Sequence, residues 1–356
     1  MEIKYQNIVL RDMRESDIDD EIRWNTVETQ WALWDAPWEM EEELRNFDPE
    51  KHREKELKWI GVPKPDHRLS LEIDTADGVH IGSVSAYCID DNFDWYKLNT
   101  EDDRRKANWA VGIEINESAY WSNGWGTQAL TAFVKYHLED GYTNLYTQTW
   151  SGNIRMIGLA QKLGFTECCR KDKIRLVRGA EYDGLTFRLN AEAFERYWER
   201  VSYAPVIPGA ASMIAQKFGD YVTRFGCLHF GEGCCTLAAW IGPEPVGFIS
   251  LLPERLIPPL HGRCDAFIDA IEVDASCRRQ GIAGELVRRA ELWAGQHGYF
   301  QIRAWSSDDK EEAIPMWLGL GYAVCPAYMA GNDLCPDGSG HPPLGYYAAK
   351  RLDRGE

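Results

Sequence analysis

The sequence predicts a mixed α/β (α+β) fold built in two similar halves. In each half, strand signals alternate with helix signals, and a short glycine turn joins a strand pattern to a helix pattern. The turns are YWSNGWGTQAL at 120–130 and CRRQGIAGELV at 277–287. They lie roughly 155 positions apart, about the length of one domain. A chain of 356 residues has the length of two domains, which we place at 1–198 and 199–356.

The first half reads as strands and helices around one glycine turn. RESDIDDEIRWN at 14–25 has Ser16 in the place of an N-cap residue, which favours a helix. Two strand patterns flank ADG at 76–78, a hairpin signal. The stretch 91–106 reads as an exposed insertion, and Gly164 ends the last helix. Strands are expected at 8–13, 67–74, 79–90, 108–115, 144–150 and 184–190, and helices at 14–25, 127–138 and 153–164.

The second half repeats much of this order. The stretch 190–212 between the halves reads as a helix followed by a link that contains Pro and Gly. No clear counterpart of the first strand of the chain follows this link. Strands are expected at 234–242, 245–252, 266–274, 299–306, 323–329 and 344–352, and helices at 285–298 and 311–321.

The composition predicts a globular protein of the cytoplasm. The chain is 44% hydrophobic, and no apolar run approaches the ~20 residues of a membrane span. The first residues, MEIKYQNIVLRDM, lack the apolar core of a signal peptide. Ten cysteines without CxxC or HExxH spacing are therefore expected to be reduced thiols, and we expect no metal site.

The formal net charge of −17 narrows the classes of partner. Phosphates call for basic patches, so we expect no nucleic-acid partner. A negative cleft concentrates positive ligands, which suits a cationic substrate. The same charge also serves solubility, so both readings stand at this point.

The glycine turns suggest a phosphate site. A strand, a turn and a helix gather free backbone N–H groups around one point, where the helix dipole adds positive potential. Glycine removes the Cβ that would keep a diphosphate away. A single copy could be only a tight turn. Here there are two copies, and each is followed by a strand and a helix that ends in QKLGF at 161–165 or LGLGY at 318–322.

Together with Asn153 at the start of the later helix, these features resemble the GCN5-related N-acetyltransferases, the GNAT superfamily. Arg278 to Ala283, RRQGIA, matches the family signature Q/R-x-x-G-x-G/A. The first half has Trp121 at the Q/R place, as is usual in the branch that acetylates ribosomal-protein N-termini and some aminoglycosides. The resemblance implies two tandem GNAT domains, as in mycothiol synthases. Each would be a mixed, mostly antiparallel twisted sheet flanked by helices.

The resemblance also implies acetyl-CoA as cofactor and assigns its contacts. The turn amides would hold the pyrophosphate, and the strand before each turn would pair with the pantetheine arm. That strand often bulges in the family, which turns a backbone N–H towards the thioester oxygen. Lys310 stands in the second half where the first has the pantetheine-contacting asparagine. The expected cofactor residues are Ile115, Ser122, Asn123, Gly124, Trp125, Gly126, Thr127 and Asn153, and then Val273, Arg278, Arg279, Gln280, Gly281, Ile282, Ala283 and Gly284.

The chemistry needs a base, because a lysine-like amine has a pKa near ~10.4 and arrives protonated. The strands before the turns offer Glu114, Asp269 and Glu272, each of which could instead be a solvated or salt-bridged strand residue. Both halves lack the family's usual general acid. Trp317 and Met156 stand where relatives often carry Tyr or Ser. Solvent or another residue would then protonate the thiolate, or one half is not catalytic.

The segment 29–44, TQWALWDAPWEMEEEL, lies where the family shapes its acceptor site. Its aromatic and acidic side chains, Trp31, Trp34, Asp35 and Trp38, could bind a cationic amine, or the tryptophans could be core packing. We predict an N-acetyltransferase acting on a small amine such as an aminoglycoside or polyamine. A protein N-terminus or lysine, a non-catalytic acyl-CoA sensor and a dinucleotide-binding enzyme are the alternatives.

Overall fold

The computed structural model describes residues 1–98, 103–219, 221–256, 262–328 and 344–352. The chain divides into two compact units, Met1–Arg200 and Val201–Glu356. The predicted boundary after residue 198 falls at the last residue of helix α6 (Ala191–Trp198). Within the described residues, no helix is both long and apolar enough to span a membrane.

The first unit is built on an eight-stranded sheet with the order β1-β2-β3-β4-β5-β6-β8-β7. All neighbours are antiparallel except the pair β5 and β6. Its strands are β1 (Glu2–Tyr5), β2 (Ile8–Arg11), β3 (Ser70–Thr75), β4 (His80–Ile89), β5 (Asn108–Ile115), β6 (Leu145–Trp150), β7 (Phe165–Val177) and β8 (Ala180–Leu189). Its other helices are α1 (Asp17–Thr26), η1 (Thr29–Leu33), α2 (Pro37–Arg45), α3 (Pro49–Ile60), η2 (Ser118–Tyr120), α4 (Trp125–Glu139) and α5 (Ile154–Lys162).

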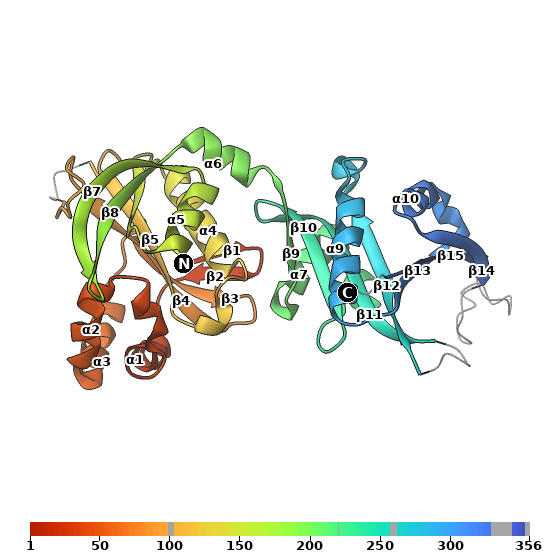
Figure 1. The fold of residues 1–356 in the computed structure, drawn as a ribbon, viewed down its shortest axis with the longest axis horizontal. Helices are drawn as coiled ribbons and strands as arrows, with labels where there is room; N and C mark the ends of the chain where they lie inside the picture. Colours follow the sequence, from red (N-terminus) through yellow and green to blue (C-terminus); the bar gives the residue numbers. More distant parts are fainter. Residues whose placement is uncertain (99–102, 220, 257–261, 329–343, 353–356) are drawn as a thin grey trace. The chain divides into compact units, whose positions relative to one another are not determined.

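Helix α4 supplies the core of this unit because its apolar residues recur on one face. Leu130, Phe133 and Val134 are fully buried and belong to one cluster with Ile8 and Leu10 of β2. Helices α1 to α3 gather at one end of the unit (Figure 1). The long hairpin of β7 and β8 reaches α2, which it contacts.

Helix α1 is held by a buried ion cluster that sequence analysis did not find. The Arg11 guanidinium donates to both carboxylate oxygens of Asp17, at 2.6 and 2.9 Å, and to Asp74 of β3 at 2.6 Å. The helix starts after Ser16, as expected, but the Ser16 side chain makes no cap bond. Asp17 instead accepts the N–H of Arg14 at 2.7 Å, because its carboxylate lies back over the start of the helix.

The second unit has a seven-stranded sheet with the order β14-β15-β13-β12-β11-β10-β9, in which only β12 and β13 are parallel. Its strands are β9 (Val201–Pro205), β10 (Cys235–Ile241), β11 (Glu244–Arg255), β12 (Cys264–Val273), β13 (Gln301–Ser307), β14 (Ala323–Tyr328) and β15 (Leu344–Arg351). Its helices are η3 (Pro208–Ala210), α7 (Ala211–Phe218), α8 (Tyr221–Arg224), η4 (Ala275–Cys277), α9 (Ile282–Gln296), η5 (Asp308–Ala313) and α10 (Ile314–Gly319).

The two sheets confirm the predicted fold class, with one correction. The second unit does have a first strand, β9, which pairs antiparallel with β10. It lies within the stretch read as a link. This strand is short, sits at the sheet edge and ends in Pro205, so its pattern was weak. The strand expected at 323–329 is β14, whose predicted last residue lies outside the described residues.

The insertion at 91–106, the cysteines and the possible metal ligands can be followed where the structure describes them. In the insertion at 91–106, Trp95 is 69% exposed and its backbone bridges to Ile89. Residues 99–102 of that insertion lie outside the described residues. Nine described cysteines are free thiols. Among the described residues no three His, Cys, Asp or Glu side chains converge as metal ligands.

Candidate active site

Both glycine turns have the same backbone geometry. Gly124 and Gly281 have φ of 87° and 84° and precede helices of 15 residues each. Two positions earlier, Ser122 and Arg279 have φ of 63° and 62°. A Cβ added at Gly124 or Gly281 would meet nothing within 4 Å, so the space before each helix is open. No side chain caps either helix, so the first-turn amides and the dipole are available to an anion.

The residue that opens each signature binds the strand before it. In the first unit, Trp121 Nε1 donates to the carbonyl of Ile115 at 2.6 Å. In the second, Arg278 Nε donates to the carbonyl of Val273 at 3.1 Å. Trp121 and Arg278 therefore make the same kind of contact, because each donates an N–H of a planar group to a carbonyl of the strand before its turn. Their contacts also occupy the carbonyls at which we expected the pantetheine arm.

The parallel strands separate before they reach each turn. β5 pairs with β6 only at Trp109 and Ala110, and Thr147 Oγ1 then donates to the carbonyl of Val111 at 2.8 Å. From Gly112 to Ile115 the strand pairs with β4 alone. The open edge leaves backbone groups for an extended ligand that carries amides, in the manner of strand addition.

The second unit separates its strands in the same way but adds a bulge. β12 pairs with β13 up to Ile268, and Asp269 is then the extra residue between two registers with β11. β5 keeps one register with β4 along its whole length. The bulge expected from the resemblance is therefore present in β12 and absent from β5.

A cavity of about 900 Å³ connects the turn to the acceptor segment in the first unit. Of the predicted site residues it is lined by Trp31, Trp34, Asp35, Trp38, Glu114, Ile115, Ser122, Gly124, Gly126, Thr127 and Asn153. The three tryptophans of the acceptor segment are half-buried and line the cavity, so they are not core packing. Asn123 is exposed and Trp125 packs on Tyr120, with neither in the cavity wall.

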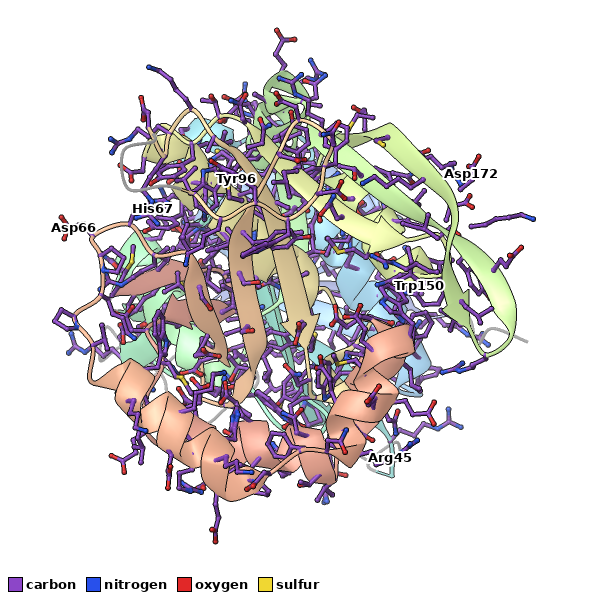
Figure 2. All side chains as sticks on the ribbon, turned by 90° about the vertical axis from the view of Figure 1, so that its left-hand side faces the viewer. Arg45, Asp66, His67, Tyr96, Trp150 and Asp172 are labelled. Carbon is purple, nitrogen blue, oxygen red and sulfur yellow. The ribbon has the colours of Figure 1, made fainter. Side chains whose placement is uncertain are left out.

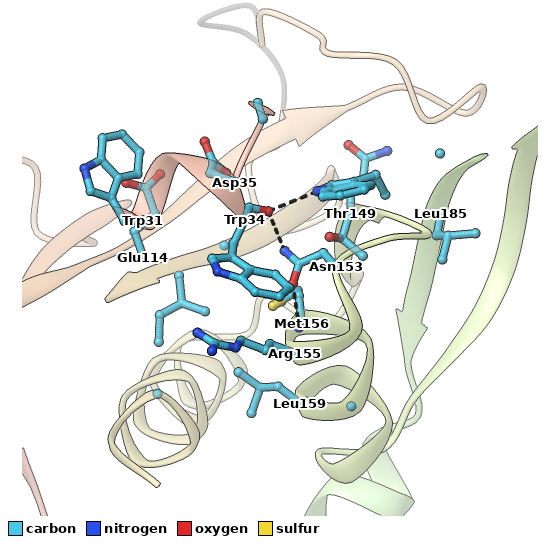
Figure 3. A pocket seen from close by; sticks show the side chains of 18 of the residues that line it. Trp31, Trp34, Asp35, Glu114, Thr149, Asn153, Arg155, Met156, Leu159 and Leu185 are labelled. Carbon is cyan, nitrogen blue, oxygen red and sulfur yellow. Dashed lines mark hydrogen bonds between the residues drawn. The ribbon is translucent and has the colours of Figure 1, made fainter. Parts of the chain in front are cut away.

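The acceptor segment is tied to helix α5 through one carbonyl (Figure 3). The carbonyl of Trp34 accepts from Trp150 Nε1 at 3.0 Å and from Asn153 Nδ2 at 2.8 Å. Asn153 Oδ1 also accepts the N–H of Met156 at 3.0 Å, which caps α5. Trp150 lies between α2 and the β7–β8 hairpin (Figure 2), with its ring 6.3 Å from Trp38. Asn153 therefore holds the wall of the cavity, and it keeps one N–H and one lone pair for a ligand.

Two carboxyl groups that line this cavity have raised pKa values. Burial, together with the nearby charge of Asp35, raises the pKa of Glu114 to about 8, against a hydrogen bond with Asn116 that lowers it. Burial also raises the pKa of Asp35, with contributions from Glu39 and Glu43. A carboxylate whose pKa lies near neutrality suits a general base.

Cations that sequence analysis missed line the same cavity. The Arg155 guanidinium lies 4.4 Å from the ring centre of Trp34 and 4.5 Å from that of Trp121. Arg175 lies 4.4 Å from the ring of Trp38. Lys162 Nζ lies 3.4 Å from Thr127 Oγ1, and burial lowers the pKa of this lysine.

Two of these cations sit on the cofactor side of the cavity. Arg155 stacks on the tryptophan that opens the turn, and Lys162 touches the first turn of α4. The sequence around Arg155 and Lys162 did not indicate these contacts, because each contact joins residues more than thirty positions apart.

In the second unit, Asp269 has a partner that sequence analysis also missed. Its Oδ2 lies 2.8 Å from His229 Nε2. Glu272 is half-buried on β12 opposite Phe248. Trp317 is 1% exposed and packs on Tyr322 in the core, so it lies away from solvent.

The remaining predicted residues lie on or beside the second turn. Arg278, Arg279, Gln280 and Gly281 are exposed, Ile282 is buried under the sheet, and Ala283 and Gly284 are half-buried in the first turn of α9. The carbonyl of Lys310 accepts from the Tyr346 hydroxyl at 2.8 Å.

Comparison with known protein families agrees with this geometry. Residues 7–166 match a family described as acetyltransferase (GNAT) domain, and residues 195–322 match one described as acetyltransferase (GNAT) family. The two matches cover most of the chain. The protein belongs to the GNAT acetyltransferases and carries two such domains in tandem. This class comprises acetyl-CoA-dependent N-acetyltransferases.

Solved structures of similar fold align with about half of the chain. A GNAT-family acetyltransferase from Bacillus anthracis is 14% identical over 54% of this chain and 99% of that one, with a TM-score of 0.37. A ribosomal-protein-alanine N-acetyltransferase from Escherichia coli is 12% identical over 44% and 97%, with a TM-score of 0.33. An aminoglycoside 6′-N-acetyltransferase complexed with coenzyme A is 16% identical over 44% and 99%, with a TM-score of 0.32. Among curated protein sequences, no match was found.

Proposed function

We propose that the first unit transfers an acetyl group from acetyl-CoA to a primary amine, with Glu114 as general base. The observation that carries this proposal is the single cavity that joins the open turn at Gly124 to Glu114 and to the tryptophan-lined segment. When bound, acetyl-CoA supplies the acetyl group as a thioester. The residues of the chain have to hold it, orient the amine and take up a proton.

Three parts of the first unit would hold acetyl-CoA: the glycine turn, two cationic side chains and the edge of β5. The open space at Gly124 and the uncapped start of α4 would let the amides of Ser122 to Thr127 hold a pyrophosphate. Arg155 and Lys162 supply positive charge beside that turn, since neither has a carboxylate partner among the described residues. The open edge of β5 from Gly112 to Ile115, apart from the Ile115 carbonyl that Trp121 occupies, would accept the amide-bearing arm.

Glu114 would take the proton of the incoming ammonium group. It lies on the open part of β5, beside the edge along which the thioester arm would run. Its raised pKa, about 8, leaves a basic carboxylate at the pH at which the amine must be deprotonated. Direct transfer then requires only that both substrates are positioned together.

We propose a small cationic amine, such as an aminoglycoside or polyamine, as acceptor. In their deprotonated form, the carboxyl groups of Asp35 and Glu114 would pair with an ammonium group in a pocket whose walls include Trp31, Trp34 and Trp38, and aromatic faces attract cations. A volume of about 900 Å³ is in the range of small-molecule sites. A protein N-terminus or lysine is the second candidate.

An acetylation screen distinguishes these acceptors and tests the enzyme itself. Kanamycin, spermidine and an alanine-initiated peptide are offered with acetyl-CoA, and release of the free thiol is followed. Transfer to kanamycin or spermidine is the expected result. Transfer only to the peptide would move the acceptor to the second candidate, and binding of acetyl-CoA without any transfer would indicate a sensor.

A further inference from the structure

The second unit holds a histidine and a carboxylate where its strands separate. His229 Nε2 lies 2.8 Å from Asp269 Oδ2. Asp269 is the bulge residue of β12 and directly follows Ile268, the last residue paired with β13. The same strand continues to the turn that contains Gly281. The pair therefore lies at the head of the open edge that leads to the second anion-binding turn.

The backbone of His229 is fixed by buried hydroxyl groups. Its N–H donates to Ser250 Oγ at 2.9 Å and to Thr236 Oγ1 at 3.2 Å, and its carbonyl accepts from Thr236 Oγ1 at 2.8 Å. Thr236 and Ser250 are 3% and 0% exposed. His229 lies outside any helix or strand, so these contacts fix its backbone, and the bond to Asp269 then fixes its ring.

The ring can act as a base because only one nitrogen is engaged. In the neutral tautomer, Nε2–H donates to the Asp269 carboxylate, which leaves the lone pair of Nδ1. Among the described residues, Nδ1 has no hydrogen-bond partner. The side chain of His229 is 21% exposed, so a substrate can reach it.

The charged surroundings of the pair come from three elements. Burial raises the pKa of the Cys227 thiol, and the charge of Asp269 raises it further. Burial also raises the pKa of Glu254 on β11, against its ion pair with Arg303 of β13 at 2.7 Å, and Asp269 adds to that rise. The Arg303 guanidinium thus pairs with Glu254 and Asp265, while Asp269 pairs with His229.

We propose that the second unit is a second acetyl-transfer centre, in which His229 is the general base and Asp269 is its positioning residue. This inference rests on the proposed use of acetyl-CoA at the glycine turns. The acceptor ammonium gives one proton to His229 Nδ1, and its nitrogen forms a bond to the acetyl carbon. The carbon–sulfur bond breaks, and the second amine proton goes to the sulfur. His229 returns its proton to solvent.

Binding and turnover are tested in a Gly124→Glu background, which disables the first turn. We expect this variant to bind one acetyl-CoA by calorimetry and to lose that binding when Gly281→Glu is added. Its remaining thiol release in the screen of amines should fall about 100-fold with His229→Gln, while acetyl-CoA binding stays unchanged. Absence of binding in the background, absence of turnover, or turnover within twofold in the His229→Gln variant would overturn the proposal.

A readout independent of turnover tests the role of Asp269. Ring nitrogen NMR shifts of labelled histidine should report the Nε2–H tautomer for His229, and Asp269→Asn should remove this preference. A tautomer that is the same in both proteins contradicts a positioning role. Glu114→Gln serves as a second background if Gly124→Glu unfolds. If Glu114→Gln changes nothing while His229→Gln removes all activity, the first-unit proposal fails and this one stands.

Discussion

At the scale of single residues, the two units place different candidate bases beside similar turns. Glu114 depends on burial and on Asp35 for its raised pKa, whereas Asp269 lies at a bulge and contacts a histidine. The sequence could single out Glu114 and Asp269 as candidates because both belong to strand patterns that run into a glycine turn. It could not identify His229, since its partner is forty positions away.

Glu114→Gln should lower kcat/KM of the first unit by about 100-fold or more, because the base is lost while the shape is kept. In the native enzyme, kcat/KM should rise with pH through about 8, since the active form of Glu114 is deprotonated and its pKa is raised to that value. The variant should lose this rise. A pH profile measured in a His229→Gln background isolates the first unit, and an unchanged profile would exclude Glu114 as the base.

At the scale of elements, the local patterns predicted most strands and helices but not what fixes them to each other. Helix α1 was predicted from its own residues, but the Arg11 cluster that anchors it joins residues sixty-three positions apart. Strand β9 was missed because a short edge strand has little hydrophobic alternation. The cavity wall is held by such long-range contacts. The sequence therefore predicted many of the residues that line it, but not how they contact each other.

Arg11→Met should destabilise the protein by about 3–5 kcal/mol, because the carboxylates of Asp17 and Asp74 would stay buried without a partner. Arg14→Met is the matched control. Its side chain is 53% exposed, so the change should be within about 0.5 kcal/mol. Urea unfolding measures both. Equal effects would show that the cluster adds nothing beyond a surface ion pair.

Asn153→Ala should cost about 1 kcal/mol as a lost cap and should also raise KM for the acceptor, because the carbonyl of Trp34 loses a donor. Asn190→Ala is the control. Asn190 caps α6 by accepting the N–H of Ala193 at 3.0 Å, and it does not line the cavity. In thermal unfolding, Asn153→Ala should lose at least as much stability as Asn190→Ala, since it also breaks the contact with the Trp34 carbonyl, and only Asn153→Ala should change KM. A KM that changes equally in both would rule out the link through Trp34.

At the scale of the whole molecule, the two-fold repeat could be predicted because each glycine turn is formed by a few consecutive residues of the sequence. Both turns have the same φ values and the same open space, so both units should bind acetyl-CoA. Calorimetry on the intact chain should give a stoichiometry near two, and Gly124→Glu and Gly281→Glu should each halve it. A stoichiometry near one would leave one unit as a scaffold, and the variants would identify which.

The Arg155 stack has a kinetic consequence. One guanidinium rests on Trp121, beside the cofactor turn, and on Trp34, in the acceptor wall. A ligand that displaces Trp121 from Ile115 must also disturb the cation that supports Trp34. We therefore expect compulsory order in the first unit, with the donor entering before the amine and the free thiol leaving last. The amine then finds its full subsite only after the donor has bound, so the empty enzyme does not hold the acceptor in a dead-end complex.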